Sequence, residues 1–521
     1  MMTAFMPQTY GYPLDELLTG FVSDDTVIDS DCEVTGLSIN SREVHQGDLF
    51  IACRGEQHHA LKFAVDAINR GAVAIVYETP LDNIEDLAGL AVYAIPVIAV
   101  SGLSNKVGFI ADRFYARPSQ SMRVVGVTGT NGKTSCSHFL AQVLANDDNP
   151  VALLGTLGNG MYGKLQPSTH TTPDAVFVQQ FLARMLEQNV VDAVMEVSSH
   201  GIEQGRVNGV TFSTAVFTNL SREHLDYHGD MESYGRSKAR LFQMPGLRYA
   251  VINADDEFGC SLLESLQDTV QSVAYSLSDA MNADAAVLRN NVMHLGCVQG
   301  SDLQFTDDGL SMHISSPWGD TELRSHLYGR FNAENILAVL ATALINGMRI
   351  GDAVERIELL TNVAGRMQHV EGSADQPLVM VDYAHTPDAL QHALQAMRMH
   401  GQGHLWCVFG CGGDRDTGKR PLMGAVADEH ADEIVLTDDN PRTEDSTAIL
   451  SQIQAGIKRQ KNLHVESDRE RAIAYALAHA GADDVVLIAG KGHEEYQLVG
   501  DRRLPFSDIN VARQILTGAQ Q

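Results

Sequence analysis

The stretch GVTGTNGKTS, residues 126–135, combines glycines, hydroxyl side chains and one lysine in a pattern suited to holding phosphate. It follows an apolar β-branched run at 123–127 and precedes a helical pattern. In that position, backbone N–H groups and the start of a helix form a cradle for anions. Lys133 could reach the β and γ phosphates of a nucleotide, and the Thr134 hydroxyl could bind Mg²⁺. A plain Gly-rich turn would explain the glycines but not the Lys-Thr pair, so we predict nucleotide binding, although Val127 stands where the strict pattern has glycine.

A second stretch, TDDNPRTED at residues 437–445, sets Arg442 among four carboxylates. A proline beside the arginine is compatible with a turn held by a salt bridge. The same residues could instead bind an anionic group, because arginine offers a planar fork of donors that matches a carboxylate. The pattern by itself leaves both interpretations open.

The overall composition excludes some classes of partner. The 521 residues include 66 Asp and Glu against 37 Lys and Arg, a formal charge of -29. Such a chain has no basic face for nucleic acid or for an anionic membrane. The longest apolar run, 87–100, is shorter than the roughly 20 residues of a membrane helix and contains Pro96. No Lys or Arg precedes Arg42, and the seven cysteines lack C-x-x-C pairing, so we expect a cytoplasmic protein with reduced thiols and no membrane insertion.

Short β-branched runs alternate with helical patterns, which is typical of parallel α/β sheets. The length allows about three domains of roughly 150 residues, and the pattern restarts near residues 120 and 362. Near the C-terminus, Ser467 is spaced as a helix N-cap and Gly481 as a helix stop. Strands are expected at 71–77, 123–127, 193–197, 215–219, 250–255, 378–384, 405–410, 433–439 and 484–490, and a helix at 332–344.

Further motifs follow the phosphate loop between residues 126 and 494. In chain order they are GTNGKT, MEVSSHGIEQGR, FTNLSREHLDYHGDM, INADD, GRFNAENILA, DYAHTPDAL, GCGGDRDTGKRPLMG, DDNPR and GKGHE. With them the chain resembles the Mur ligase family, ATP-dependent enzymes that build the peptide of bacterial cell-wall precursors. The resemblance implies a three-domain α/β architecture: a UDP-binding domain at 1–120, a central ATP-binding domain with a parallel sheet and phosphate loop at 121–362, and a Rossmann-like amino-acid-binding domain at 363–521.

The resemblance also implies a reaction. ATP would phosphorylate the D-glutamyl carboxylate of UDP-N-acetylmuramoyl-L-alanyl-D-glutamate, and the amine of meso-2,6-diaminopimelate would then displace phosphate from the acyl phosphate. Such a site must neutralise the charge that it gathers, so Mg²⁺ is expected with ATP. The implied ATP contacts are Gly129, Thr130, Asn131, Gly132, Lys133, Thr134, Ser135, Asn335, Arg366, Asp382 and His385.

The implied catalytic residues are Lys133, Glu196, His224 and Lys238, and the implied metal ligands are Thr134, Glu196, His224 and Lys238. Glu196 ends a strand beside the loop, where open α/β sheets place their ligands. An ordinary Lys238 ammonium would repel Mg²⁺. The resemblance implies that this lysine is carbamylated (N6-carboxylysine), which would turn it into an oxygen ligand.

The remaining implied contacts concern the two cosubstrates. Uridine contacts are Ile39, Ser41, Glu56, Gln57 and His58, and muramoyl dipeptide contacts are His170, Thr171, Thr172, Ser198, Gln204 and Arg206. Diaminopimelate contacts are Arg415, Asp439, Asn440, Pro441, Arg442, Gly490 and Glu494. The far end of diaminopimelate carries a carboxylate and an ammonium, so a selective pocket needs a fork of donors with an acid nearby. This favours the second interpretation of TDDNPRTED, with Arg442 binding the far carboxylate.

Two alternatives are compatible with part of this pattern. The folylpolyglutamate synthetase branch of the same fold shares the phosphate loop and the lysine, but not the muramoyl-type motifs. A nucleotide-binding scaffold without activity would have lost catalytic groups, yet Lys133, Glu196, His224 and Lys238 are all present. We expect a monomeric ligase.

Overall fold

The computed structural model describes residues 11–23, 26, 28, 30–55, 58–81, 87, 89–277, 293–306, 309–373 and 375–518. The chain divides into two compact units. The first contains residues 1–274 and 283–296, and the second contains residues 275–282 and 297–521.

The first unit begins with a small parallel sheet in the strand order β3-β4-β5-β6. Its apolar strand residues are buried, and α4 and the start of α6 pack onto the same core. The elements are β1 (Tyr12–Pro13), α1 (Leu14–Leu18), β2 (Glu33–Val34), β3 (Gly36–Ser38), β4 (Asp48–Ala52), α2 (Ala64–Arg70), β5 (Ala74–Thr79), β6 (Val97–Ser101) and α4 (Val107–Phe114).

A larger sheet follows in the order β10-β9-β8-β11-β7-β12-β13-β14. Strands β8, β11, β7, β12 and β13 run parallel, whereas β9 and β10 extend the sheet in antiparallel fashion. The parallel strands are almost wholly buried, as expected for strands covered by helices on both faces. The elements are β7 (Arg123–Thr128), α5 (Lys133–Leu144), β8 (Val151–Gly155), β9 (Gly158–Met161), β10 (Lys164–Gln166), α6 (Ala175–Glu187), β11 (Asp192–Glu196), α7 (Ser199–Glu203), β12 (Thr214–Phe217), α8 (Leu225–His228), α9 (Met231–Ala239), β13 (Tyr249–Asn253), α10 (Glu257–Glu264) and β14 (Gln271–Ser276).

The second unit starts with antiparallel strands β15, β16 and β17 and two helices. It continues into a sheet of order β18-β19-β23-β20-β21-β22, parallel except for β18. The elements are β15 (His294–Thr306), β16 (Gly309–Ser315), β17 (Thr321–Ser325), α12 (Arg330–Ile345), α13 (Ile350–Glu358), β18 (Gln368–Val370), β19 (Leu378–Asp382), α14 (Pro387–Arg398), β20 (Leu405–Phe409), α15 (Lys419–His430), β21 (Glu433–Leu436), α16 (Ser446–Gln454), β22 (Leu463–Val465), α17 (Arg469–His479), β23 (Val485–Ala489), β24 (Tyr496–Val499), β25 (Arg502–Pro505) and α18 (Asp508–Thr517).

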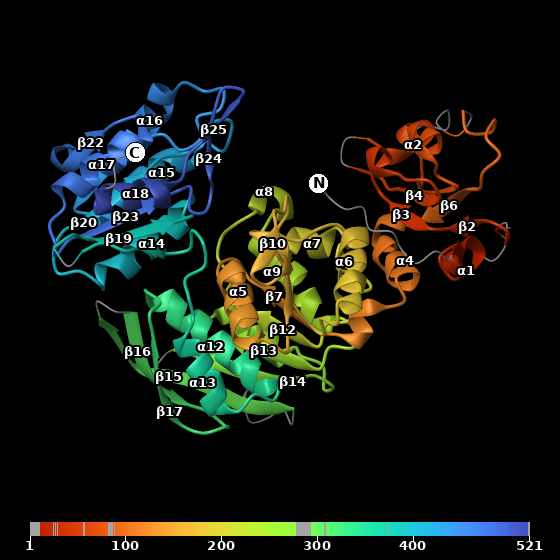
Figure 1. Ribbon diagram of the computed structural model, residues 1–521, viewed down its shortest axis with the longest axis horizontal. Helices are drawn as coiled ribbons and strands as arrows, with labels where there is room; N and C mark the ends of the chain where they lie inside the picture. The colour runs from red at the N-terminus through yellow and green to blue at the C-terminus, as the bar shows by residue number, and fades with distance from the viewer. Residues whose placement is uncertain are drawn as a thin grey trace. The chain divides into compact units, whose positions relative to one another are not determined.

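Helices cover both faces of this last sheet (Figure 1). Apolar residues of α14, α15 and α16 form the core on one face, and those of α17 and α18 form the core on the other. This is the doubly wound arrangement that the restart of the βα pattern predicts, so the Rossmann-like fold class is confirmed.

The predicted strands and the predicted helix at 332–344 are present. The predicted N-cap at Ser467 is wrong by one residue: Asp468 accepts a hydrogen bond from the Arg471 N–H, and α17 ends at His479, two residues before Gly481. All seven cysteines are free thiols. Within the described residues, no helix is long and apolar enough to cross a membrane.

Candidate active site

The phosphate loop joins the end of β7 to the start of α5, at the carboxyl edge of the parallel sheet. Gly129 and Gly132 have φ angles of +147° and +83°, and a Cβ on Gly129 would collide with Thr218 Oγ1. Glycine is therefore required at 129, since no side chain fits. Lys133 Nζ donates to the carbonyls of Gly129 and Thr130 at 2.9 and 2.8 Å, so the ammonium lies over the loop. The arrangement is that of a phosphate-binding loop.

Glu196, the last residue of β11, reaches the first turn of α5. Its carboxylate accepts hydrogen bonds from the Thr134 hydroxyl at 2.9 Å, the Thr156 N–H at 2.8 Å and the Thr156 hydroxyl at 3.1 Å. The side chain is fully buried, and these three donors are neutral. A buried carboxylate is costly without a cation. This surrounding therefore suits a bound cation beside the Thr134 hydroxyl.

Lys238 on α9 is 1% exposed and donates to the Gly129 carbonyl at 2.8 Å. Its ammonium lies 4.3 Å from the centre of the Tyr234 ring. Burial, and next the charge of Lys133, hold the pKa of Lys238 well below its usual value of 10.5. A lowered pKa increases the fraction of neutral amine, which is the form that reacts with CO₂ to give a carbamate. The lysine environment therefore fits the predicted modification.

His224 stands at the start of α8 with a φ of +56°, in the left-handed region. Its ring centre lies 4.8 Å from that of His200 and 6.2 Å from that of Tyr234. Tyr234 in turn hydrogen-bonds the Thr130 hydroxyl at 3.3 Å. The structure therefore brings His224, Lys238 and the phosphate loop together around one tyrosine.

Most of the predicted dipeptide residues form a connected network. The Thr172 hydroxyl donates to the Glu196 carbonyl at 2.9 Å and lies 3.0 Å from the Ser198 hydroxyl. Arg206 donates to the Thr172 carbonyl at 2.8 Å and to Gln204. The Thr156 hydroxyl lies within hydrogen-bond distance of both the Thr171 hydroxyl, at 3.0 Å, and the Glu196 carboxylate, at 3.1 Å. His170, directly before Thr171 in the chain, is exposed, and its Nδ1 lies 2.9 Å from the Thr169 hydroxyl.

The predicted uridine residues lie in the small sheet of the first unit. Ile39 and Ser41 follow β3, and His58 follows β4. Because β3 and β4 are adjacent parallel strands, both loops leave the same edge of the sheet. Glu56 and Gln57, also predicted there, lie outside the described residues.

Four predicted nucleotide contacts belong to the second unit. Arg366 lies over the Tyr383 ring at 4.9 Å, and His385 Nδ1 is 2.9 Å from the Tyr383 carbonyl oxygen. Asp382 accepts from the backbone N–H groups of residues 367 and 384, and burial raises its pKa. Asn335 is buried on α12 and donates to Asn332. Arg366, Asp382 and His385 thus gather around Tyr383.

The predicted amino-acid residues also meet in the second unit, at the carboxyl ends of β20, β21 and β23. Arg442 Nη1 donates to the Gly413 carbonyl at 2.7 Å, and Asn440 donates to Glu494 at 2.8 Å. Gly490, with a φ of +115°, presents no side chain toward Asp439. Pro441, which lies between Asn440 and Arg442 in the chain, is buried. Arg415 is exposed on the loop that follows β20.

One residue of this pocket escaped the sequence analysis. Lys491 is fully buried and donates to Glu494 at 3.0 Å and to Asn440 at 3.1 Å. It lies within the motif GKGHE, in which Gly490 and Glu494 are the predicted diaminopimelate contacts. The available signal was a lysine directly after an apolar strand, at the ligand-bearing edge of a parallel sheet.

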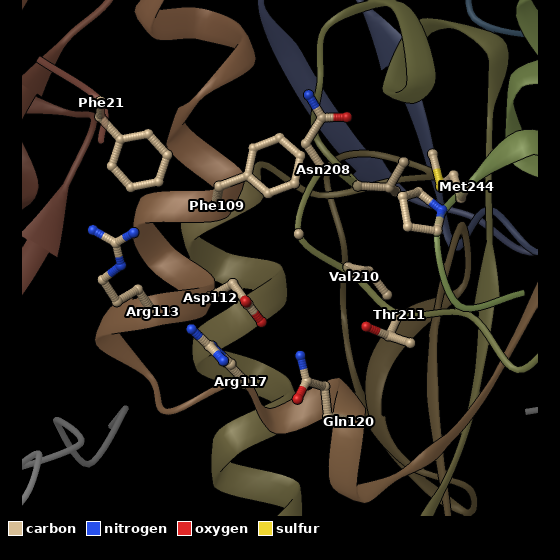
Figure 2. A pocket seen from close by; sticks show the side chains of 13 residues that line it. Phe21, Phe109, Asp112, Arg113, Arg117, Gln120, Asn208, Val210, Thr211 and Met244 are labelled. Carbon is tan, nitrogen blue, oxygen red and sulfur yellow. The ribbon is translucent and has the colours of Figure 1, made fainter. Parts of the chain in front are cut away.

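A separate cavity of about 370 Å³ lies in the first unit, between α4 and the segment that leads into β12 (Figure 2). It opens at the amino ends of β7 and β12, whereas the phosphate loop lies at their carboxyl ends. The Asp112 Oδ1 atom is buried there without a hydrogen-bond partner among the described residues. Burial raises the pKa of Asp112 to about 6, although Arg117 and Arg113 act to lower it.

A phosphate loop at the carboxyl edge of a parallel sheet, with a buried acid on the next strand, defines the class of phosphate-loop nucleotide-binding proteins. Three regions match family models, described as the Mur ligase middle domain at 127–343, the Mur ligase glutamate ligase domain at 365–492, and the Mur ligase family catalytic domain at 33–107. The chain belongs to the Mur ligase family. It is an ATP-dependent ligase that forms amide bonds.

Individual relatives agree along nearly the whole chain. The UDP-N-acetylmuramoyl-L-alanyl-D-glutamate--2,6-diaminopimelate ligase of Chromobacterium violaceum is 48% identical over 482 residues, covering 92% of this chain and 93% of its own. A solved structure of a ligase of the same name is 35% identical with a TM-score of 0.70, covering 98% and 99% of the two chains. A Mycobacterium tuberculosis folylpolyglutamate synthase shares the fold alone, at 17% identity, a TM-score of 0.54 and coverage of 74% and 92%. The three-domain α/β fold class is thereby confirmed.

Proposed function

We propose that this ligase joins meso-2,6-diaminopimelate to the D-glutamyl carboxylate of UDP-N-acetylmuramoyl-L-alanyl-D-glutamate, with release of ADP and phosphate. The observation that carries the proposal is the cluster of predicted amino-acid contacts in the second unit. There the Arg442 guanidinium and the acids Asp439 and Glu494 lie on neighbouring loops. An arginine fork beside carboxylates matches the far carboxylate and ammonium of diaminopimelate. The named relatives, 48% and 35% identical, support the same substrates.

The first unit supplies the groups for phosphoryl transfer. Loop N–H groups and Lys133 would hold the ATP phosphates, and Lys133 would neutralise charge on the transferred group. Mg²⁺ would be held by the Thr134 hydroxyl and by Glu196, whose buried carboxylate has only neutral donors. When bound, Mg²⁺ would supply charge stabilisation for the phosphoryl oxygens.

His224 and a carbamylated Lys238 would add ligands on the acyl side of the site. Among the described residues, no cluster of three or more His, Cys, Asp or Glu side chains has metal-binding geometry. Arg206, Gln204 and Thr172 would bind the anionic muramoyl dipeptide next to Glu196.

The decisive experiment measures ADP release with ATP, Mg²⁺ and the muramoyl dipeptide nucleotide, comparing diaminopimelate with lysine. We expect release only when both cosubstrates are present, with diaminopimelate preferred by at least about tenfold in kcat/KM, since about 1.4 kcal/mol of differential binding gives one decade. Equal use of lysine would contradict the amino-acid assignment. ADP release that depends instead on a folate and glutamate would favour the folylpolyglutamate synthetase alternative, and no release with any pair would favour the inactive scaffold.

The remaining features of the proposal follow from the same function. The domains are a UDP-binding domain at 1–120, an ATP-binding domain at 121–362 and an amino-acid-binding domain at 363–521. The protein acts as a monomer in the cytoplasm, where its nucleotide substrates are found. Sedimentation at micromolar concentration tests the monomer, and fractionation of cells tests the location.

A further inference from the structure

Lys491 is a lysine with no exposed surface, placed behind the amino-acid pocket. It follows β23 by two residues, and its Nζ lies 3.0 Å from Glu494 Oε2 and 3.6 Å from Asp439 Oδ1. These two carboxylates are 17% and 11% exposed. A single buried cation is therefore shared by two partly buried acids.

Asn440 connects the same groups. Its Oδ1 accepts from Lys491 at 3.1 Å and from the Leu498 N–H at 2.9 Å, and its Nδ2 donates to Glu494 at 2.8 Å. These contacts orient the amide and fix the Glu494 carboxylate. Asp439 Oδ1 is buried and has no hydrogen-bond partner among the described residues. The cation nearest to this atom is Lys491 Nζ, at 3.6 Å, so the Asp439 charge is balanced by Lys491 without a hydrogen bond.

The charges of this cluster can be counted. Asp439 and Glu494 contribute two negative charges and Lys491 one positive charge, so the group carries one net negative charge. Together with the positive charge of Arg442, one net negative charge gives a neutral site, which matches an ammonium and a carboxylate. Without Lys491, two negative charges would surround the same ammonium and would repel the adjacent carboxylate of the substrate.

We propose that Lys491 determines substrate specificity by charge balance: by neutralising one of the two pocket carboxylates, it makes the pocket accept a zwitterionic side-chain end rather than a simple cation. The proposal rests on the proposed function, since it assigns a cause to the preference for diaminopimelate over lysine. Lys491 acts through Asp439 and Glu494 and is a positioning residue.

The test compares three variants in kcat/KM for diaminopimelate and for lysine. Lys491→Met keeps the side-chain volume and removes the charge, leaving two net negative charges. We expect the diaminopimelate-to-lysine ratio to fall at least about tenfold, as specificity follows the difference between the two binding free energies. Glu494→Gln leaves the cluster neutral, and we expect the ratio to rise because lysine loses its attraction. The double variant Lys491→Met/Glu494→Gln restores one net negative charge, and we expect its ratio to return to within about threefold of the wild-type value.

Three results would overturn the proposal. Equal losses for both amino acids in Lys491→Met would give Lys491 a purely structural role. A lowered ratio that the double variant fails to restore would mean that Lys491 binds the substrate carboxylate itself. If Lys491→Met does not fold, the other two variants still test the proposal. Charge balance is rejected if the diaminopimelate-to-lysine ratio does not rise in Glu494→Gln, or if it stays low in the double variant.

Two controls separate this proposal from the function on which it rests. Lys461→Met removes an exposed lysine of the same unit, next to β22, and should leave both amino acids unaffected. The KM for ATP should remain within about twofold of the wild-type value in all variants, since Lys133 and the phosphate loop belong to the first unit. Absence of diaminopimelate-dependent turnover in the wild-type protein would reject the proposed function. Turnover with an unchanged ratio in the variants would reject only the role of Lys491.

Discussion

Replacement of Arg442 by alanine should separate a substrate-binding role from a structural one. The backbone of Arg442 is held independently of its side chain: its N–H donates to the Leu498 carbonyl at 3.0 Å, and its carbonyl accepts from the Gly500 N–H at 2.7 Å. Alanine retains both bonds. What Arg442→Ala removes is the 2.7 Å bond from Nη1 to the Gly413 carbonyl and the positive charge in the pocket.

The two losses have different sizes for the two amino acids. The bond to Gly413 holds the pocket wall, so its loss of about 1 kcal/mol should lower kcat/KM about fivefold for diaminopimelate and lysine alike. Truncating one partner of a buried charge pair costs roughly 2–5 kcal/mol, and the lower end applies because Arg442 is only half-buried. The lost charge pair therefore lowers kcat/KM by a further factor of about 30, for diaminopimelate alone. We therefore expect a loss of about 150-fold for diaminopimelate and about fivefold for lysine.

The assay couples ADP release to a spectroscopic signal, with each amino acid varied at saturating ATP and muramoyl dipeptide nucleotide. Arg471→Ala is the matched control, because it removes an arginine of the same unit whose side chain is 77% exposed. This control variant should leave kcat/KM unchanged for both diaminopimelate and lysine. Equal losses for diaminopimelate and lysine in Arg442→Ala would show that the arginine only supports the Gly413 loop, and would refute its role in carboxylate binding.

Further variants test the first unit. Lys133→Ala should abolish ADP release in a folded protein, as judged by circular dichroism, because it removes the charge over the transferred phosphoryl group. Glu196→Gln keeps the shape but not the charge beside Thr134. It should lower kcat by at least about 100-fold and raise the Mg²⁺ concentration for half-maximal rate, while unchanged Mg²⁺ dependence would exclude Glu196 as a ligand. Lys238→Ala should be nearly inactive and not rescued by bicarbonate, and intact mass under gentle conditions should show one added CO₂ on the wild type only. Asp112→Asn should stabilise the protein at pH 7.5 but not at pH 4. The folded pKa of Asp112 is about 6 against 3.8 in the unfolded chain, so its stability contribution falls as pH rises through that window. Solvent screening reduces the roughly 3 kcal/mol that two pKa units represent to about 1 kcal/mol, measurable by urea unfolding. Equal stabilisation at both pH values would contradict this origin.

The sequence predicted those features that depend on local patterns. Nine strands, the phosphate loop and α12 are encoded by contiguous apolar runs and by glycines with positive φ, and all are present; the strands are β5, β7, β11, β12, β13, β19, β20, β21 and β23. Strands β3, β4, β6, β8, β14 and β22 were not predicted, and neither were the antiparallel strands β9, β10 and β15 to β17. The residues of these antiparallel strands alternate between buried and exposed over short lengths, and their pairing depends on partners rather than on their own sequence.

Contacts between distant segments were beyond local patterns. Arg469 is fully buried and bonds Asp508 in a bidentate pair, and it also donates to the carbonyls of Asp438 and Ala489. It thereby joins the ends of β21 and β23, which carry the amino-acid pocket. Neither its spacing nor its neighbours in the chain distinguish it from the exposed Arg471 two residues later.

The stretch TDDNPRTED illustrates why residue types in sequence misrepresent their partners in space. The four acids around Arg442 all have other contacts. Asp438 accepts from Ser446, Asp439 lies beside Lys491, Glu444 forms a bidentate pair with Arg420, and Asp445 caps α16. Within the described ranges no salt bridge involves Arg442, whose Nη1 donates to a neutral carbonyl. A half-buried guanidinium without a salt bridge, whose neighbouring acids have other contacts, is suited to a carboxylate from outside the chain, because substrate binding there breaks no existing ion pair.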